Sequence, residues 1–214
     1  MQKLEFDKKL IRWWMKNRRK FVWRETKDPY KILVSEILLH RTRAKQVTFF
    51  YSELIHKYPT LEKLAAADEK QLTELLRPLG LLWRTKLLRL AAQTLITDYG
   101  GNIPHSKKDL LKLPGIDQYI ASAVVCFAFG QPEPILDTNT VRILGRVFGI
   151  STSDSSRRSQ LFIGLYTSLL DFKSPRKFNY AMLDLAALVC KPYKPKCQEC
   201  PVLKLCNYGS LYGG

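Results

Sequence analysis

The sequence predicts an all-α protein, and three observations support this fold class. Apolar residues recur at helical spacing through most of the chain, as in Ile32, Val34, Ile37 and Leu38. Glycines and prolines divide the chain into short segments, and no convincing run of alternating strand residues appears between them. With 214 residues, 46% of them apolar, the chain can bury a core either as one large domain or as two small packed lobes.

About ten short helices are expected, and the clearest start signal is Asp28-Pro29. Asp is a favourable N-cap and Pro is tolerated at the first helical position, so a helix should begin here and contain Glu36 within its mostly apolar sequence. Later breaks are expected at the glycines and the Pro-Gly pair, which end helices. The further helices fall roughly at residues 59–66, 68–77, 83–98, 106–112, 118–129, 138–148, 155–170 and 175–189.

The charge of the chain predicts a polyanionic partner. Thirty-five Lys and Arg residues against nineteen Asp and Glu residues give a formal net charge of +16. The excess is spread along the chain, which suits a surface that follows a nucleic-acid backbone. A membrane partner is not expected, because no basic helix with a strongly apolar opposite face flanks the chain ends and no lipidation motif is present. Without a signal peptide or a long apolar run, a cytoplasmic protein is expected, at the nucleoid of a prokaryote.

Four of the five cysteines lie close together near the end of the sequence, in the pattern C-x6-C-x2-C-x5-C. They are Cys190, Cys197, Cys200 and Cys206. A secreted disulfide framework is not expected, because the rest of the chain would have no cross-link. Four thiolates at this spacing suit either tetrahedral zinc or an iron–sulfur cluster, and the spacing alone leaves both open. The fifth, Cys126, is expected to be a small buried hydrophobic residue.

Residues 113–119, Leu-Pro-Gly-Ile-Asp-Gln-Tyr, are expected to join two helices by a tight turn. Such a hairpin exposes backbone N–H groups at the start of its second helix, where they can hold a phosphate without reading sequence. An ordinary helical turn is the simpler interpretation. Asp137 follows Tyr119 by eighteen residues, at the start of another predicted helix. A lone Asp at that place is usually only an N-cap, so the combination is more informative than either feature.

The hairpin, Asp137 and the cysteine pattern together resemble the endonuclease III superfamily of helix-hairpin-helix DNA glycosylases, over nearly the whole chain. The resemblance implies that the four cysteines hold a 4Fe-4S cluster rather than zinc. It implies a two-lobed all-α fold, with a six-helix lobe containing the hairpin at about 28–134 and a cluster-bearing lobe made of 1–27 and 135–214. The substrate would be double-stranded DNA with a mismatched base flipped into the cleft between the lobes, bound by a monomer.

The resemblance also implies three catalytic residues. Asp137 falls on the family's catalytic carboxylate, which would stabilise the positive charge that builds on the sugar as the glycosidic bond breaks. Tyr119 replaces the Lys with which bifunctional members form a Schiff base, so a monofunctional enzyme without efficient strand cleavage is expected. Glu36 stands where the adenine branch and the thymine/uracil branch of the family have a Glu. Its apolar helix should raise its pKa, so that it could protonate or hydrogen-bond the departing base.

Two observations favour the branch that excises thymine or uracil mispaired with guanine in base excision repair. Residues 37–42, Ile-Leu-Leu-His-Arg-Thr, resemble that branch more than the Gln-Gln-Thr typical of adenine glycosylases. The chain also ends eight residues after Cys206, where adenine glycosylases commonly have a further domain that recognises oxidised guanine. An adenine-specific mismatch glycosylase and a catalytically silent binder of distorted DNA are the alternatives. The presence of both Glu36 and Asp137 argues against the silent binder.

Further residues are expected to contact DNA. By resemblance, Arg41 and Leu81 lie where the family inserts side chains into the gap left by the flipped nucleotide, although Leu81 could equally be part of the core. The expected contacts of the hairpin are Leu113, Gly115, Ile116 and Gln118. Family hairpins usually have a second Gly where this chain has Asp117. Asp tolerates unusual backbone angles, but its negative charge is unfavourable beside a phosphate.

Overall fold

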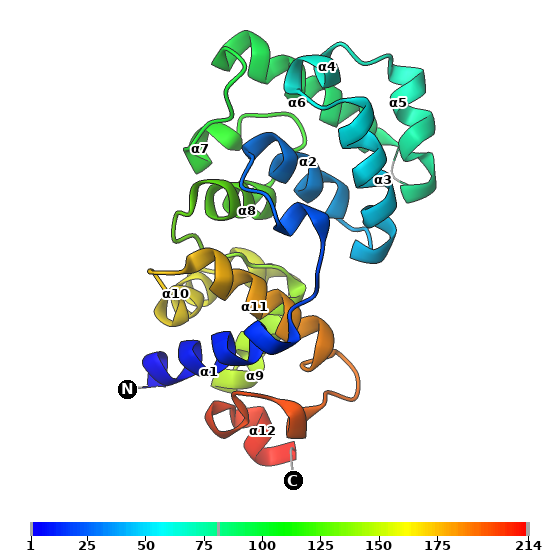
Figure 1. Ribbon diagram of the computed structural model, residues 1–214. Coiled ribbons are helices and arrows are strands. Elements are labelled where there is room, and N and C mark those ends of the chain that lie inside the picture. The colour runs from blue at the N-terminus through cyan, green and yellow to red at the C-terminus, as the bar shows by residue number, and fades with distance from the viewer. Residues whose placement is uncertain (1, 81, 213–214) are drawn as a thin grey trace. The chain divides into compact units, whose positions relative to one another are not determined.

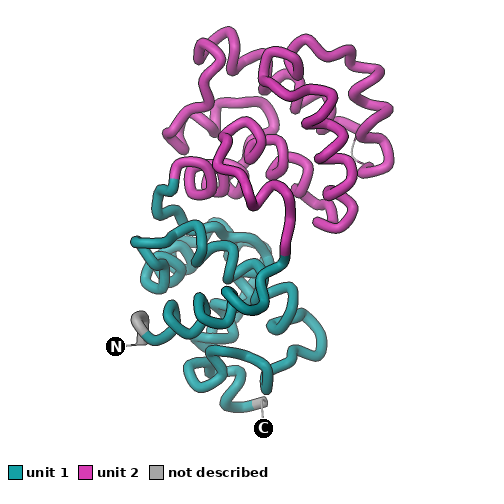
Figure 2. Tube along the Cα trace, in the orientation of Figure 1, with its two compact units in different colours: residues 1–19, 130–214 teal, residues 20–129 magenta. Residues whose placement is uncertain are grey.

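The chain forms two compact helical units. In a computed structural model, which describes residues 2–80 and 82–212, all regular secondary structure is helical (Figure 1). The predicted all-α class is confirmed. One unit comprises residues 20–129, and the other comprises residues 1–19 and 130–214 (Figure 2). The division thus falls after residues 19 and 129, where the sequence suggested boundaries after residues 27 and 134.

The unit of residues 20–129 is built around one buried helix. Its described α-helices are α2 (Pro29–Leu39), α3 (Ala44–Lys57), α4 (Leu61–Ala65), α5 (Glu69–Leu76), α6 (Trp83–Tyr99), α7 (Lys107–Leu110) and α8 (Gln118–Phe129). Helix α2 packs against α3, α6 and α8. Residues 32–38 of α2 are all buried, which explains why this segment is apolar on every side rather than amphipathic.

The unit of residues 1–19 and 130–214 packs α11 against α1 and α9. Its described α-helices are α1 (Gln2–Asn17), α9 (Thr138–Phe148), α10 (Gln160–Leu169), α11 (Pro175–Leu188) and α12 (Asn207–Tyr212). The carboxylate of Asp184 in α11 is fully buried and is paired on both oxygens. It accepts hydrogen bonds from Trp14 Nε1 at 2.9 Å and from Arg19 Nε at 2.6 Å. These bonds compensate for the burial of a charge and fasten α1 to α11.

Local sequence signals explain where several helices begin and end. The predicted start of α2 is confirmed, because Asp28 Oδ1 accepts the backbone N–H of Tyr30 at 2.9 Å and Pro29 occupies the first helical position. The predicted helix at 155–170 is wrong in one respect. Residues Asp154–Arg158 form a 3-10 helix, and α10 starts only at Gln160 because Ser159 is extended, with φ −74° and ψ 131°. Within the described part of the chain, no helix has both the length and the apolar character needed to cross a membrane.

Candidate active site and cysteine cluster

Glu36 places a buried carboxyl group on helix α2. Only 3% of the residue is exposed, and Oε2 has no hydrogen-bond partner among the described residues. Burial raises the pKa of Glu36 to about 8, and the positive charge of Arg24 limits the rise. The shift has the direction expected for a carboxyl group in an apolar helix. At neutral pH most of this group is therefore protonated and can donate a proton or a hydrogen bond.

Asp137 is the N-cap of α9, and hydrogen bonds fix both of its carboxylate oxygens. Oδ1 accepts the backbone N–H of Asn139 at 2.9 Å and that of Thr140 at 2.7 Å. The hydroxyl of Thr140 in turn accepts the N–H of Asp137 at 2.9 Å, which completes a capping box. Oδ2 accepts from Asn139 Nδ2 at 2.7 Å. The result is a half-buried carboxylate held in one orientation at the positive end of a helix.

A row of side chains along α9 connects Asp137 to the cysteine loop. Asn139, which donates to Asp137, accepts from Arg142 Nη1 at 3.1 Å. Arg142 also donates to the backbone oxygens of Cys190 at 2.9 Å and Ala186 at 3.2 Å. The orientation of the Asp137 carboxylate therefore depends on the backbone at the first cysteine. Neither Asn139 nor Arg142 was predicted as a site residue from the sequence.

The four cysteines of the C-x6-C-x2-C-x5-C pattern line one cavity. Two donors are aimed at the sulfur atoms: Arg146 Nη1 lies 3.3 Å from Cys190 Sγ, and the N–H of Gly209 lies 3.4 Å from Cys206 Sγ. A Cβ atom on Gly209 would lie 2.6 Å from Leu203 Cδ1, so glycine allows this close approach. Among the described residues, no group of three or more His, Cys, Asp or Glu side chains is arranged to hold a metal ion. The remaining cysteine, Cys126, is fully buried in α8, as predicted.

The predicted hairpin joins α7 to α8 by a turn that depends on Gly115. Its φ is +78°, and a Cβ atom there would lie 2.9 Å from Leu87 Cβ of α6. The side chains of Leu113 and Ile116 are buried, with 3% and 7% exposed. They can reach DNA only through their backbone, whereas Gly115 and Gln118 are exposed.

Asp117 has a local structural role in the hairpin. Its Oδ1 accepts the N–H of Ile120 at 2.9 Å, so Asp117 caps α8. The left-handed backbone angle of the turn belongs to Gly115, and Asp117 has no positive φ. The second oxygen, Oδ2, lies 3.4 Å from His40 Nε2, at the end of α2. A protonated His40 would offset the negative charge of Asp117, which is unfavourable beside a phosphate.

The other predicted site residues belong to the same unit as Glu36. Tyr119 is half-buried in the first turn of α8. Arg41 is exposed in the turn that follows α2 and has a φ of +60°. Leu81 lies outside the described residues. Glu36, Arg41, Tyr119 and the hairpin thus belong to residues 20–129, whereas Asp137 and the four cysteines belong to the other unit.

The chain belongs to the HhH-GPD superfamily of base excision DNA repair proteins, whose family model matches residues 34–163. It is 36% identical to the thymine/uracil-DNA glycosylase of Methanothermobacter thermautotrophicus, over 95% of this chain and 92% of that protein. It is 41% identical to the thymine-DNA glycosylase of Aeropyrum pernix, over 94% of this chain and 92% of that protein. Relatives named adenine DNA glycosylase also match, at 30–34% identity. A solved structure of a thermostable thymine-DNA glycosylase has a TM-score of 0.92 at 35% identity and covers 98% of this chain and 97% of its own.

Proposed function

We propose that this protein is a monofunctional DNA glycosylase that removes thymine or uracil mispaired with guanine in double-stranded DNA. The observation that supports it best is that a chain of this family has two carboxyl groups suited to different steps of the reaction, one that would act protonated and one that would act ionised. Glu36 is buried with a pKa of about 8, and Asp137 is an oriented carboxylate at a helix N-terminus. The names of the relatives that match nearly the whole chain supply the substrate class. The net charge of +16 suits the DNA backbone.

Asp137 would act on the sugar. As the bond between the sugar C1′ and the base nitrogen breaks, its electron pair leaves with the base and positive charge builds on the sugar. A fixed carboxylate stabilises that charge without reorganising, because Asn139 and Thr140 already hold both of its oxygens. Water then forms the new bond to C1′ and loses a proton, which leaves an abasic site.

Glu36 would act on the departing base. A protonated carboxyl group can donate to the oxygen or nitrogen on which the base accumulates negative charge. The burial that keeps Glu36 protonated at neutral pH therefore serves the reaction, even though it leaves one carboxyl oxygen without a hydrogen-bond partner among the residues that the structure describes.

Tyr119 would limit the reaction to base release. No amine replaces the missing Schiff-base lysine at this position, and a phenol cannot form an imine with the sugar. The enzyme should leave an abasic site that breaks only in alkali, and borohydride should trap no covalent complex with DNA. Efficient trapping by the wild type would show that another amine acts as a nucleophile and would contradict the monofunctional part of the proposal.

A 4Fe-4S cluster would be held by Cys190, Cys197, Cys200 and Cys206. The four sulfur atoms are not gathered around a single metal ion. They line one cavity, however, as the separate irons of a cluster need, and Arg146 and the N–H of Gly209 are aimed at two of them. When bound, the cluster would supply iron–thiolate bonds that fix the loop of residues 190–206. Zinc is the competing interpretation. A brown protein with about four iron and four sulfide per chain would support the cluster, and a colourless zinc protein would contradict it.

The function is tested by single-turnover base release from four labelled duplexes, which carry G·T, G·U, A·G and A opposite oxidised guanine. Release of thymine and uracil, detected as alkali-sensitive sites, is the expected result. Release of adenine alone would show that the protein is an adenine-specific mismatch glycosylase. If no duplex loses a base while all four are bound, the silent DNA-binding alternative would replace the proposal.

A further inference from the structure

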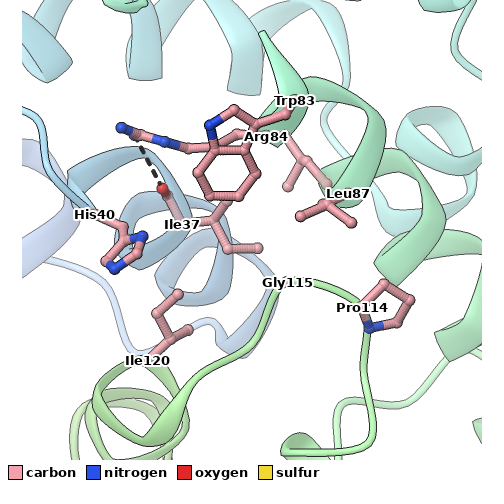
Figure 3. A pocket seen from close by; sticks show the side chains of 9 residues that line it. Ile37, His40, Trp83, Arg84, Leu87, Pro114, Gly115 and Ile120 are labelled. Carbon is pink, nitrogen blue, oxygen red and sulfur yellow. Dashed lines mark hydrogen bonds between the residues drawn. The ribbon is translucent and has the colours of Figure 1, made fainter. Parts of the chain in front are cut away.

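Arg84, at the start of α6, is a buried cation that the proposed chemistry does not use. Only 5% of the residue is exposed. Its Nη1 donates to the backbone oxygen of Leu38 at 3.0 Å, to that of Ile37 at 3.5 Å and to Thr42 Oγ1 at 2.9 Å. Figure 3 shows the guanidinium directed from α6 toward the end of α2, with the bond to Ile37 drawn as a dashed line. All three acceptors lie at or just beyond the C-terminal end of α2.

These bonds provide partners for backbone carbonyl groups at the C-terminal end of α2. The last four carbonyl groups of an α-helix have no partner within it. In α2, the oxygens of Glu36 and Leu39 accept from the backbone N–H groups of His40 and Thr42, at 3.2 Å and 3.1 Å. The remaining two carbonyl groups are the ones that Arg84 binds. A cation at this position also interacts favourably with the negative end of the helix.

The turn that Arg84 fastens contains a strained residue. Arg41 has a φ of +60°, in the left-handed region that residues with a Cβ rarely adopt. Such a conformation persists when the surrounding structure fixes it on both sides, and it is common at functional sites. Here the N–H of His40 is bound within α2, and Thr42 is bound through both its N–H and its hydroxyl. The side chain of Arg41 is exposed.

We propose that Arg84 is a positioning residue that holds the turn of residues 40–42, through Thr42 and the end of α2, in the conformation that presents Arg41 to DNA. The inference rests on the proposed function, in which Arg41 enters the gap left by the flipped base. Arg84 follows the other predicted inserting residue, Leu81, by three positions in the sequence.

The test removes the bond to Thr42 while keeping the shape of the side chain. Thr42→Val loses the hydroxyl that Arg84 binds, and Thr42→Ser keeps it. Arg84→Met keeps an unbranched side chain but removes the guanidinium, whose Nη1 makes all three bonds. Arg89→Lys is the matched control, because Arg89 lies on the same helix but pairs with Glu69, at 2.7 Å. Thermal unfolding verifies that each variant is folded.

Two readouts separate positioning from general stability. The first is trypsin cleavage after Arg41 and Arg43, identified by the masses of the products, in the protein without DNA. The second is the equilibrium of base flipping, followed by the fluorescence of 2-aminopurine placed beside a G·T pair, together with the affinity for an undamaged duplex. Thr42→Val should be cleaved about tenfold faster and should flip the base about tenfold less, as the loss of one hydrogen bond predicts. Arg84→Met, which loses all three bonds, should be affected at least as strongly. Affinity for the undamaged duplex should change little.

Thr42→Ser and Arg89→Lys should behave as the wild type in both readouts. The inference is overturned if Thr42→Val matches the wild type, or if Thr42→Ser is as impaired as Thr42→Val, because the hydroxyl would then not matter. Failure of the wild type to flip or release any base would instead overturn the proposed function. The trypsin comparison would still decide whether Arg84 holds the turn.

Discussion

The side-chain amide of Asn139 donates to Oδ2 of Asp137 at 2.7 Å, two residues along the chain in the first turn of α9. The same amide group accepts from Arg142, so its orientation is fixed from the other side. Asn139 thus fixes the position of Oδ2 of Asp137. The backbone bonds to Oδ1 fix only one of the two oxygens.

Asn139→Ala should therefore slow base release with little effect on folding. The carboxylate keeps its capping bonds but can rotate away from the position that suits the developing charge, and a displacement of this kind can reduce the rate on the order of 100-fold. The measurement is the single-turnover rate constant on a G·T duplex, with thermal unfolding as the check on structure. A variant as fast as the wild type would show that Asn139 does not orient the carboxylate.

The raised pKa of Glu36 predicts how base release depends on pH. If the protonated carboxyl group is required, the single-turnover rate constant falls as pH rises through about 8, the pKa of this residue. Above that pH it should fall roughly tenfold per pH unit. Glu36→Gln should be slower at pH 7 and should lack this descending limb. The same limb in wild type and variant would exclude Glu36 as its origin.

The same pKa predicts a change in stability, with a defined sign. Because folding raises the pKa of Glu36 from 4.5 to about 8, the folded protein holds this proton more tightly than the unfolded chain does. The resulting stabilisation is fully present below pH 4.5 and is lost as pH rises to about 8. The free energy of unfolding of Glu36→Gln, measured relative to that of the wild type, should therefore increase from low to high pH. The increase should total a few kcal/mol, because each unit of pKa shift corresponds to about 1.4 kcal/mol. Denaturant unfolding of both proteins in acid and in mild alkali measures the difference.

Asp117→Asn should tighten DNA binding. Asparagine caps a helix about as well as aspartate, so α8 keeps its start while the negative charge of the hairpin disappears. Removal of one exposed charge beside a phosphate should increase affinity about threefold to fivefold at low salt, and the gain should shrink as salt is added. Fluorescence anisotropy at several salt concentrations measures it. Unchanged affinity at every concentration would mean that the hairpin does not lie against a phosphate.

Cys200→Ala should remove the cluster and destabilise the unit that contains it. The loop of residues 190–206 would lose its iron–thiolate bonds, and with them part of the free energy of folding. The expected result is a colourless protein with a lower temperature of unfolding. Cys126→Ala is the matched control, because Cys126 is buried in α8 and lies in the other unit. Equal iron content in both variants would contradict the assigned ligands.

Local signals in the sequence were sufficient for much of the fold. The predicted helices at 118–129 and 138–148 match α8 and α9 because Asp117 and Asp137 cap them and Gly130 and Gly149 follow them. No range was predicted for α1, α3 or α12. The break at Ser159 was also not predicted, because the sequence on both sides of it has helical spacing.

The polar contacts that support the site could not be predicted in the same way. Asn139, Arg142 and Arg146 recur at intervals of three and four residues, so the sequence places them on one face of α9. Their partners are distant in the chain: Arg142 binds the carbonyl group of Cys190, 48 residues away. Arg84 likewise binds Leu38, 46 residues earlier. Such pairs depend on how the helices pack, which helical periodicity does not specify.

The central claim is that Asp137 drives release of a mispaired pyrimidine, and chromatography of the free base tests it most directly. Wild type, Asp137→Asn and Asp137→Ala are each incubated with a G·T duplex. The protein concentration is kept above that of the duplex and above the dissociation constant for DNA. Asparagine keeps the cap of α9 and alanine loses it, at a cost of about 1 kcal/mol, so unfolding separates stability from chemistry. The account predicts free thymine from the wild type alone, with Asp137→Asn as stable as the wild type and still bound to DNA. Thymine release by Asp137→Asn at the wild-type rate would contradict it.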